Sequence, residues 1–156
     1  MTNEENYKKI MIPLDGSKYS QSALKVAIEI ARKFDSSLYL VTVVDISEVS
    51  PPGALLGLHN RELRKSLIQI RSAVRYKVEK TLLENVAICK KNGIETHYNI
   101  LEGRVADELL NFIKKANINL VVIGSQGLSG IDKLKALGSV SRKISELTRC
   151  PVLIMH

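Results

Sequence analysis

A run of glycines followed by a glycine–serine pair has the clearest chemical potential in this chain. Gly124, Gly127 and Gly130 follow an apolar stretch at three-residue intervals, and Gly138-Ser139 stands where a helical pattern begins. Glycine lets backbone amides approach an anion without a Cβ in the way, and a helix N-terminus adds unpaired N–H groups and a favourable dipole. The segment predicts a phosphate site. Alternatively, the glycines only make a turn and Ser139 only caps the helix.

Asp15 is the second candidate, because it ends the apolar run KKIMIPLD and precedes Gly16-Ser17. Its carboxylate could accept hydrogen bonds from ribose hydroxyls or hold a metal ion beside phosphates. It could equally order the turn that follows. The sequence contains neither the P-loop signature, nor the dinucleotide G-x-G-x-x-G pattern, nor a G-x-S-x-G nucleophile elbow, and no residue presents itself as a general base.

A metal site built from side chains is not expected. His59, His97 and His156 are widely separated, and no His or Cys pair has metal-ligand spacing. Cys89 and Cys150 match no redox motif either, so both are expected to be buried structural thiols.

Alternating elements must position these candidates. Apolar runs predict strands at 8–15, 36–45, 96–103, 119–125 and 151–155, and helical periodicity predicts intervening helices, the longest over 62–91. Segment 47–60, with its prolines and glycines, is expected to be irregular. This order predicts a doubly wound α/β fold, a mostly parallel sheet with helices on both faces. Ligands bind such sheets beyond the carboxyl ends of the strands, where Asp15 and Gly124 stand.

Length and charge narrow the class further. The 156 residues predict one domain over 1–156, and the polar N-terminus together with the lack of a long apolar stretch predicts a cytoplasmic protein without a membrane span. The net charge is +7, and nine cations face three carboxylates between residues 60 and 92. The excess of positive charge could bind the phosphates of a nucleic acid. Tyr76 is the only aromatic residue in this stretch, however, which favours a solvated helix face.

Taken together, these segments resemble the ATP-binding branch of the universal stress protein family. The resemblance rests on Gly-x2-Gly, a spacer and Gly-Ser, on the opening KKIMIPLDGSKYSQSAL, and on Cys150-Pro151-Val152-Leu153 near the end. It implies a Rossmann-like, five-stranded parallel sheet in the order 3-2-1-4-5. One departure is the spacer Leu128 to Leu137, which has ten residues where the family usually has nine. We expect the extra residue to bulge within 131–136.

The resemblance also implies a set of nucleotide contacts. Adenosine is expected to contact Pro13, Asp15 and Val43, with Ile123 and Gly124 near the ribose. Phosphates are expected to contact Gly127, Gly138, Ser139 and Val140.

The function expected from residues and resemblance is binding of ATP, ADP or AMP, with magnesium possible beside Asp15. The chain would act as a regulatory binding module or a slow switch in a stress response, and it would form a homodimer through its C-terminal strand, residues 151–155. Two alternatives stay open: a slow ATPase or nucleotide-processing hydrolase, and a nucleic-acid-associated protein that uses the basic helix of residues 60–92.

Overall fold

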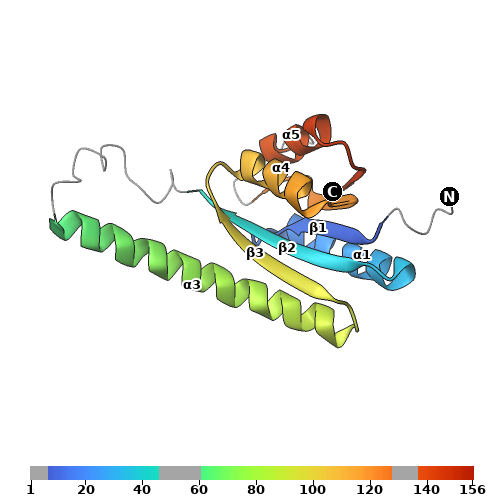
Figure 1. Cartoon of the computed structure of the whole chain (residues 1–156), viewed down its shortest axis with the longest axis horizontal. Helices are drawn as coiled ribbons and strands as arrows, with labels where there is room; N and C mark the ends of the chain where they lie inside the picture. The colour runs from blue at the N-terminus through green and yellow to red at the C-terminus, as the bar shows by residue number, and fades with distance from the viewer. Residues whose placement is uncertain (1–6, 46–60, 128–136) are drawn as a thin grey trace.

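The computed structural model describes residues 7–45, 61–127 and 137–156. Strands and helices alternate along the chain (Figure 1). The strands are β1 (Lys9–Pro13), β2 (Ser37–Val44), β3 (Thr96–Glu102), β4 (Leu120–Gly124) and β5 (Val152–Met155). The helices are α1 (Lys18–Phe34), α3 (Arg61–Lys91), α4 (Val105–Ala116) and α5 (Ser139–Leu147). The segment expected to be irregular, 47–60, lies outside the described residues.

The five strands form one parallel sheet in the order β3-β2-β1-β4-β5, so the predicted doubly wound fold is confirmed. Central β1 pairs with β2 on one side and with β4 on the other; Ile10 lies opposite Leu38 and Leu120. Every residue of β4 is buried. Continuous apolar runs mark these strands because both faces of the sheet are covered by helices.

Each face of the sheet has its own core. Ile10, Ile12 and Leu40 pack with α1 and α3 on one face, whereas Met11 and Val41 pack with α4 and α5 on the other. Figure 1 shows α4 and α5 on the opposite side of the sheet from α3. The alternation of strand side chains therefore produces a three-layer arrangement.

Helix α1 forms as its sequence predicts. Ser17 is the N-cap, and its side chain accepts a hydrogen bond from the backbone N–H of Ser20. Five apolar residues recur at three- and four-residue intervals and are all buried: Ala23, Leu24, Ala27, Ile28 and Ala31. The helix ends at Asp35 in the left-handed conformation. Its N-terminus therefore starts directly beyond β1, where the chain turns.

Helix α3 is buried only near its C-terminal end. Its buried residues are Leu82, Asn85, Val86 and Cys89, although apolar residues recur at helical spacing from Leu63 onward. Arg75 Nη1 lies 3.1 Å from Oε1 of Glu102, the last residue of β3. Residues before Arg75 consequently extend past the carboxyl end of β3, as Figure 1 shows for the green helix. The sheet ends before the helix does.

No helix in the described ranges is long and apolar enough to cross a bilayer.

Candidate functional site

The loop after β1 is shaped by Asp15. Its Oδ1 accepts a hydrogen bond from the backbone N–H of Ser17 at 2.9 Å. Gly16 has a φ of +84°, a left-handed conformation that favours glycine. Asp15 thus orders the turn, which is one of the two roles expected for it. The same hydrogen bond fixes Ser17, the N-cap of α1, directly after β1.

The loop after β4 is tied to the start of α5. The backbone N–H of Gly138 donates to the Ser125 carbonyl oxygen at 2.7 Å, and the Ser141 hydroxyl donates to the same oxygen at 2.9 Å. Ser141 and Ser125 are both buried. Gly138 is the N-cap of α5 in an extended conformation, and among the described residues no side-chain hydrogen bond caps the helix. Its N-terminal amides are therefore held beside the β4 loop without a capping group of their own.

These two loops meet at one place. A Cβ built on Gly127 would lie 2.9 Å from Asp15 Oδ2, and Ser17 Oγ lies 3.5 Å from the Gln126 carbonyl oxygen. A Cβ on Gly138 would lie 3.5 Å from the Cα of Gln126. Asp15, Gly127 and Gly138 come from three segments of the chain, and they gather at the carboxyl ends of β1 and β4. Between these two neighbouring strands the strand order reverses, which is where open α/β sheets bind ligands.

Gly124 has a packing reason to be glycine. A Cβ there would lie 2.7 Å from the Tyr19 Cβ, 2.8 Å from the Tyr19 carbonyl carbon and 2.9 Å from the Ser20 nitrogen. Gly124 is buried, so the missing side chain lets the end of β4 touch the first turn of α1. This contact brings the turn at Asp15 close to the β4 loop.

The other residues named for the nucleotide differ in how accessible their side chains are. Ile123 is buried in the core shared with α4 and α5. Val43 and Val140 are half-buried against that core, and Pro13 is also half-buried. Ser139 is exposed. Only the accessible ones could offer side-chain atoms to a ligand, so Ile123 could contribute through its backbone.

Sequence reasoning did not single out Ser125 and Ser141, which join the β4 loop to α5. Ser141 lies three residues after Gly138, and a serine hydroxyl near the start of a helix can bond neighbouring backbone groups, so its position was the available signal. Ser125 contributes its backbone carbonyl oxygen, which every residue has, so its type gave no signal. Together with the N-cap Ser17, these residues position the loops.

One ion pair joins the two helices on the α4 and α5 face. Lys143 Nζ lies 2.6 Å from Asp107 Oδ1. The hydrogen bond from Lys143, and then its charge, hold the pKa of Asp107 below its ordinary value of 3.8. Asp107 lies in the first turn of α4, where a carboxylate suits the helix dipole, and it also links α4 to α5.

Within the described ranges, no group of three or more His, Cys, Asp or Glu side chains could hold a metal ion. The spacer between Gly127 and Gly138 lies at 128–137, and all but Leu137 falls outside the described residues. Its two ends are fixed by the contacts given above. The expected bulge within 131–136 is thus a prediction that these contacts leave untested.

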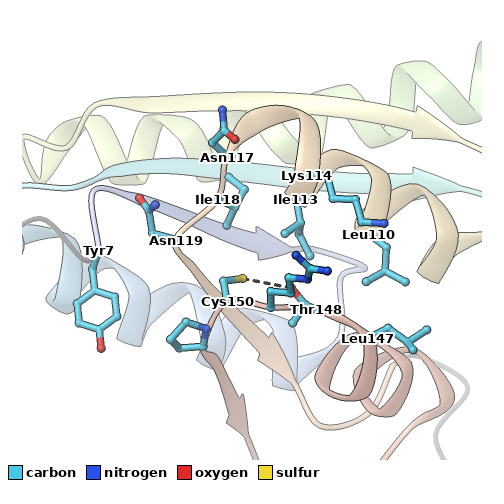
Figure 2. A pocket seen from close by; sticks show the side chains of 12 residues that line it. Tyr7, Leu110, Ile113, Lys114, Asn117, Ile118, Asn119, Leu147, Thr148 and Cys150 are labelled. Carbon is cyan, nitrogen blue, oxygen red and sulfur yellow. Dashed lines mark hydrogen bonds between the residues drawn. The ribbon is translucent and has the colours of Figure 1, made fainter.

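A groove of about 900 Å³ lies at the opposite edge of the sheet (Figure 2). Asn119, directly before β4, and Pro151, directly before β5, both line the groove. Cys150 also lines it, half-buried, with its Sγ 3.3 Å from Thr148 Oγ1. Cys89 is buried as expected, but the expectation for Cys150 was wrong, because this groove opens beside it. The groove is separate from the loops that gather Asp15 and Gly127.

Known proteins resemble this chain along nearly its whole length. The sequence model of the universal stress protein family matches residues 6–156. A universal stress protein of Methanocaldococcus jannaschii is 37% identical over 154 residues, covering 98% of this chain and 85% of that protein. The structure of the universal stress protein UspA from Lactobacillus plantarum has a TM-score of 0.81 at 21% identity, covering 97% of this chain and 99% of that one.

Two further solved structures contain nucleotides. One is a universal stress protein in complex with cAMP, with a TM-score of 0.66 at 22% identity over 97% of this chain and 98% of that one. The other is the universal stress protein from Archaeoglobus fulgidus in complex with dAMP, with a TM-score of 0.64 at 23% identity over 97% of this chain and 99% of that one. At these identities the structures show a shared fold. With the match to the family model and the 37% identical relative, they establish that this chain belongs to the universal stress protein family.

Proposed function

We propose that the carboxyl edge of the sheet binds an adenine nucleotide, and that the chain works as a nucleotide-dependent regulator in a stress response. The observation that carries this proposal is the meeting of Asp15, Gly127 and the uncapped start of α5 at the switch between β1 and β4. A helix N-terminus beside a glycine loop favours phosphate. The cAMP and dAMP complexes of two structural relatives support an adenine nucleotide as the ligand class.

Phosphates would lie between the β4 loop and α5. Gly127 and Gly138 present backbone without side chains, and the exposed Ser139 hydroxyl and the Val140 amide stand in the first turn of α5. The half-buried Pro13 and Val43 would contact adenosine at the ends of β1 and β2, with Ile123 and Gly124 beside the ribose through their backbone. Any residue other than glycine at 127 would meet the Asp15 carboxylate.

Asp15 would contribute through Oδ2. Its Oδ1 already accepts from the Ser17 amide, whereas Oδ2 points toward Gly127, where phosphates would pass. A carboxylate oxygen there could accept from a ribose hydroxyl or help to hold nucleotide-bound magnesium. Magnesium would accompany the triphosphate of bound ATP. ADP and AMP would make the same adenosine contacts as ATP.

Binding rather than fast turnover is the activity that this arrangement favours. Fast phosphoryl transfer requires a positioned nucleophile or water as well as charge stabilisation. Among the described residues at this edge, Asp15 is the one carboxylate close to Gly127, and one of its oxygens is occupied by the turn. A slow ATPase remains the second candidate, and Asp15→Asn would then abolish hydrolysis while nucleotide binding persists.

Calorimetry on protein freed of bound nucleotide tests the proposal. We expect heat of binding with ATP, ADP or AMP, and loss of binding in Gly127→Val, because the new side chain occupies the phosphate path and displaces Asp15. Ala87→Val is the matched control, since Ala87 is exposed on α3, and it should bind as the wild type does. Wild-type protein that gives no heat at millimolar nucleotide would contradict the proposal.

The spacer supplies a second test of the same site. Deleting Lys135, which lies in the segment where we place the bulge, should leave affinity within a few-fold. Adding or removing one residue changes loop-closure entropy little, whereas moving Gly138 would disturb a helix whose Ile144 is fully buried. Tightening of ATP binding by orders of magnitude on deletion would show instead that the native spacer misplaces Gly138.

We further propose a cytoplasmic homodimer that pairs along β5. This strand is the edge of the sheet and pairs with β4 in its own chain. The carbonyl of Pro151 accepts from Val121 in β4 and that of Met155 from Ser125 just after it, so the backbone of Val152 and Ile154 faces away from β4. Val152→Pro would remove one outward N–H group while sparing the ladder to β4. Light scattering should show a wild-type dimer that this substitution weakens, and wild-type monomer at micromolar concentration would refute the dimer.

A further inference from the structure

The N-terminal part of α3, Arg61 to Val74, is here called the α3 arm. No residue of it is buried. Its boundary follows from the ion pair that sets Arg75 level with Glu102 at the end of β3. Fourteen helical residues span about 21 Å at a rise of 1.5 Å per residue. The arm therefore extends well past the sheet, on the side where Figure 1 shows α3 leaving the body of the molecule.

An apolar stripe runs along the α3 arm. Leu63, Leu67, Ile70 and Val74 follow one another at intervals of four, three and four residues, so they share one helix face. Ile70 is 48% exposed and the other three are half-buried. The stripe itself uses two positions in every seven residues, the pattern of a seam between two packed helices, and the exposed Ile68 lies outside it on another side of the helix. The stripe is thus built for a helical neighbour.

The positive charge of the α3 arm indicates which kind of helix could pack against the stripe. Arg64 follows Leu63 by one residue, the flanking position where coiled coils place the charges that choose their partners. Residues 61–74 contain four cations and one carboxylate, an excess of three positive charges. Two copies of the arm would repel each other, whereas a helix with acidic flanks would be attracted.

We propose that the α3 arm docks an acidic amphipathic helix of a partner protein. The narrow stripe favours a helix over an anionic membrane, because interfacial helices carry a broader apolar face with large aromatic residues. The arm contains no aromatic residue. Its helix is continuous with the half of α3 that packs on β2 and β3, so the arm is held in place for docking by the sheet. This interaction goes beyond nucleotide binding and does not depend on it.

The test uses a labelled three-heptad peptide with leucine at the seam positions and glutamate at the flanks, titrated with the full chain by fluorescence anisotropy. A second peptide with lysine at the flanks is the charge control. We expect the acidic peptide to bind and the basic one not to bind. Arg64→Glu should weaken the first and strengthen the second, and added salt should weaken the acidic peptide's binding.

A matched pair of substitutions locates the surface. Ile70 and Leu83 are 48% and 46% exposed on the same helix, but their thirteen-residue separation puts them about 140° apart around its axis, and Leu83 lies outside the arm. Ile70→Gln should weaken acidic-peptide binding by about tenfold or more, the loss expected for one large aliphatic contact. Leu83→Gln should leave it unchanged. Circular dichroism should show both variants as helical as the wild type, since neither side chain is in the core.

Several outcomes would overturn the proposal. One is no binding of the acidic peptide at hundreds of micromolar, and another is an equal effect of the two substitutions. Binding of phosphatidylserine vesicles or duplex DNA that is lost in Ile70→Gln, without peptide binding, would assign the arm to a membrane or a nucleic acid. A dimer that Ile70→Gln dissociates in light scattering would assign the stripe to a second copy of this chain.

Discussion

Replacing Gly124 with alanine tests the close contact that brings the two loops of the site together. The added Cβ would stand 2.7 Å from the Tyr19 Cβ and 2.8 Å from the Tyr19 carbonyl carbon. Carbon atoms pack best at about 3.5–4.0 Å, so the first turn of α1 must retreat from β4 by roughly 0.8 Å or more. Backbone is on the other side of the contact, and no rotamer change relieves it.

Two opposing effects determine how much Gly124→Ala changes the free energy of unfolding. Overpacking a close contact costs about 1–3 kcal/mol. Restricting the unfolded chain by a Gly-to-Ala change returns about 0.4–1 kcal/mol. The net loss of unfolding free energy should be about 1–2 kcal/mol, which lowers the Tm of a domain of this size by roughly 2–8 °C.

Urea denaturation followed by circular dichroism measures this loss, with Gly127→Ala as the control. The nearest described atom to a Cβ at Gly127 is the end of the exposed Asp15 side chain, which can move aside. The control should retain wild-type stability. Gly124→Ala protein as stable as the wild type, or more stable, would refute the assignment of Gly124 to helix–strand packing.

Three further predictions concern stability and thiol chemistry. Ser17→Ala removes the N-cap of α1 and should lower the unfolding free energy by about 1 kcal/mol in urea denaturation. Because Lys143 holds the pKa of Asp107 below 3.8, the pair stabilises the fold at neutral pH and loses this effect as the pH falls through that lowered pKa. The stability difference between wild type and Asp107→Asn, measured by urea denaturation at several pH values, should therefore shrink in acid; a constant difference would exclude the linkage. Burial raises the pKa of the Cys89 thiol, so a thiol reagent followed by mass spectrometry should label the half-buried Cys150 in the native state and Cys89 only after unfolding.

Much of the architecture could be predicted because burial on both faces leaves a clear mark on parallel strands. Runs such as Leu120 to Ile123 are apolar without interruption, since alternate side chains enter different cores. The core face of α1 could be predicted residue by residue for a related reason: this helix packs on the sheet along its whole apolar face. The strand order itself came from family resemblance, because periodicity does not say which strands are neighbours.

The α3 arm shows where periodicity fails. The spacing of Leu67, Ile70 and Val74 predicts an apolar face equally well whether or not anything covers it. What decides burial is the length of β3, which ends at Glu102 and leaves the arm beyond it. Cys150 is a similar case, since its exposure depends on the groove formed by segments distant in sequence.

The sequence indicated which residues belong to the candidate site, but not which tertiary contacts bring them together. Gly124 and Gly127 look alike in sequence, yet one is glycine for contact with Tyr19 and the other faces the Asp15 carboxylate. Both contacts join residues more than a hundred positions apart. The local pattern holds no information about such distances, so it could not separate a packing glycine from one that a ligand would approach.

An NMR titration of nucleotide-free protein with ATP and magnesium can locate an adenine nucleotide at the carboxyl edge of the sheet. We expect the backbone amide signals of Gly127, Gly138, Ser139 and Val140 to shift progressively with ligand, while signals of the groove at the opposite edge, such as that of Thr148, stay in place. Shifts confined to that groove, or no shifts at millimolar ATP, would contradict binding at the carboxyl edge.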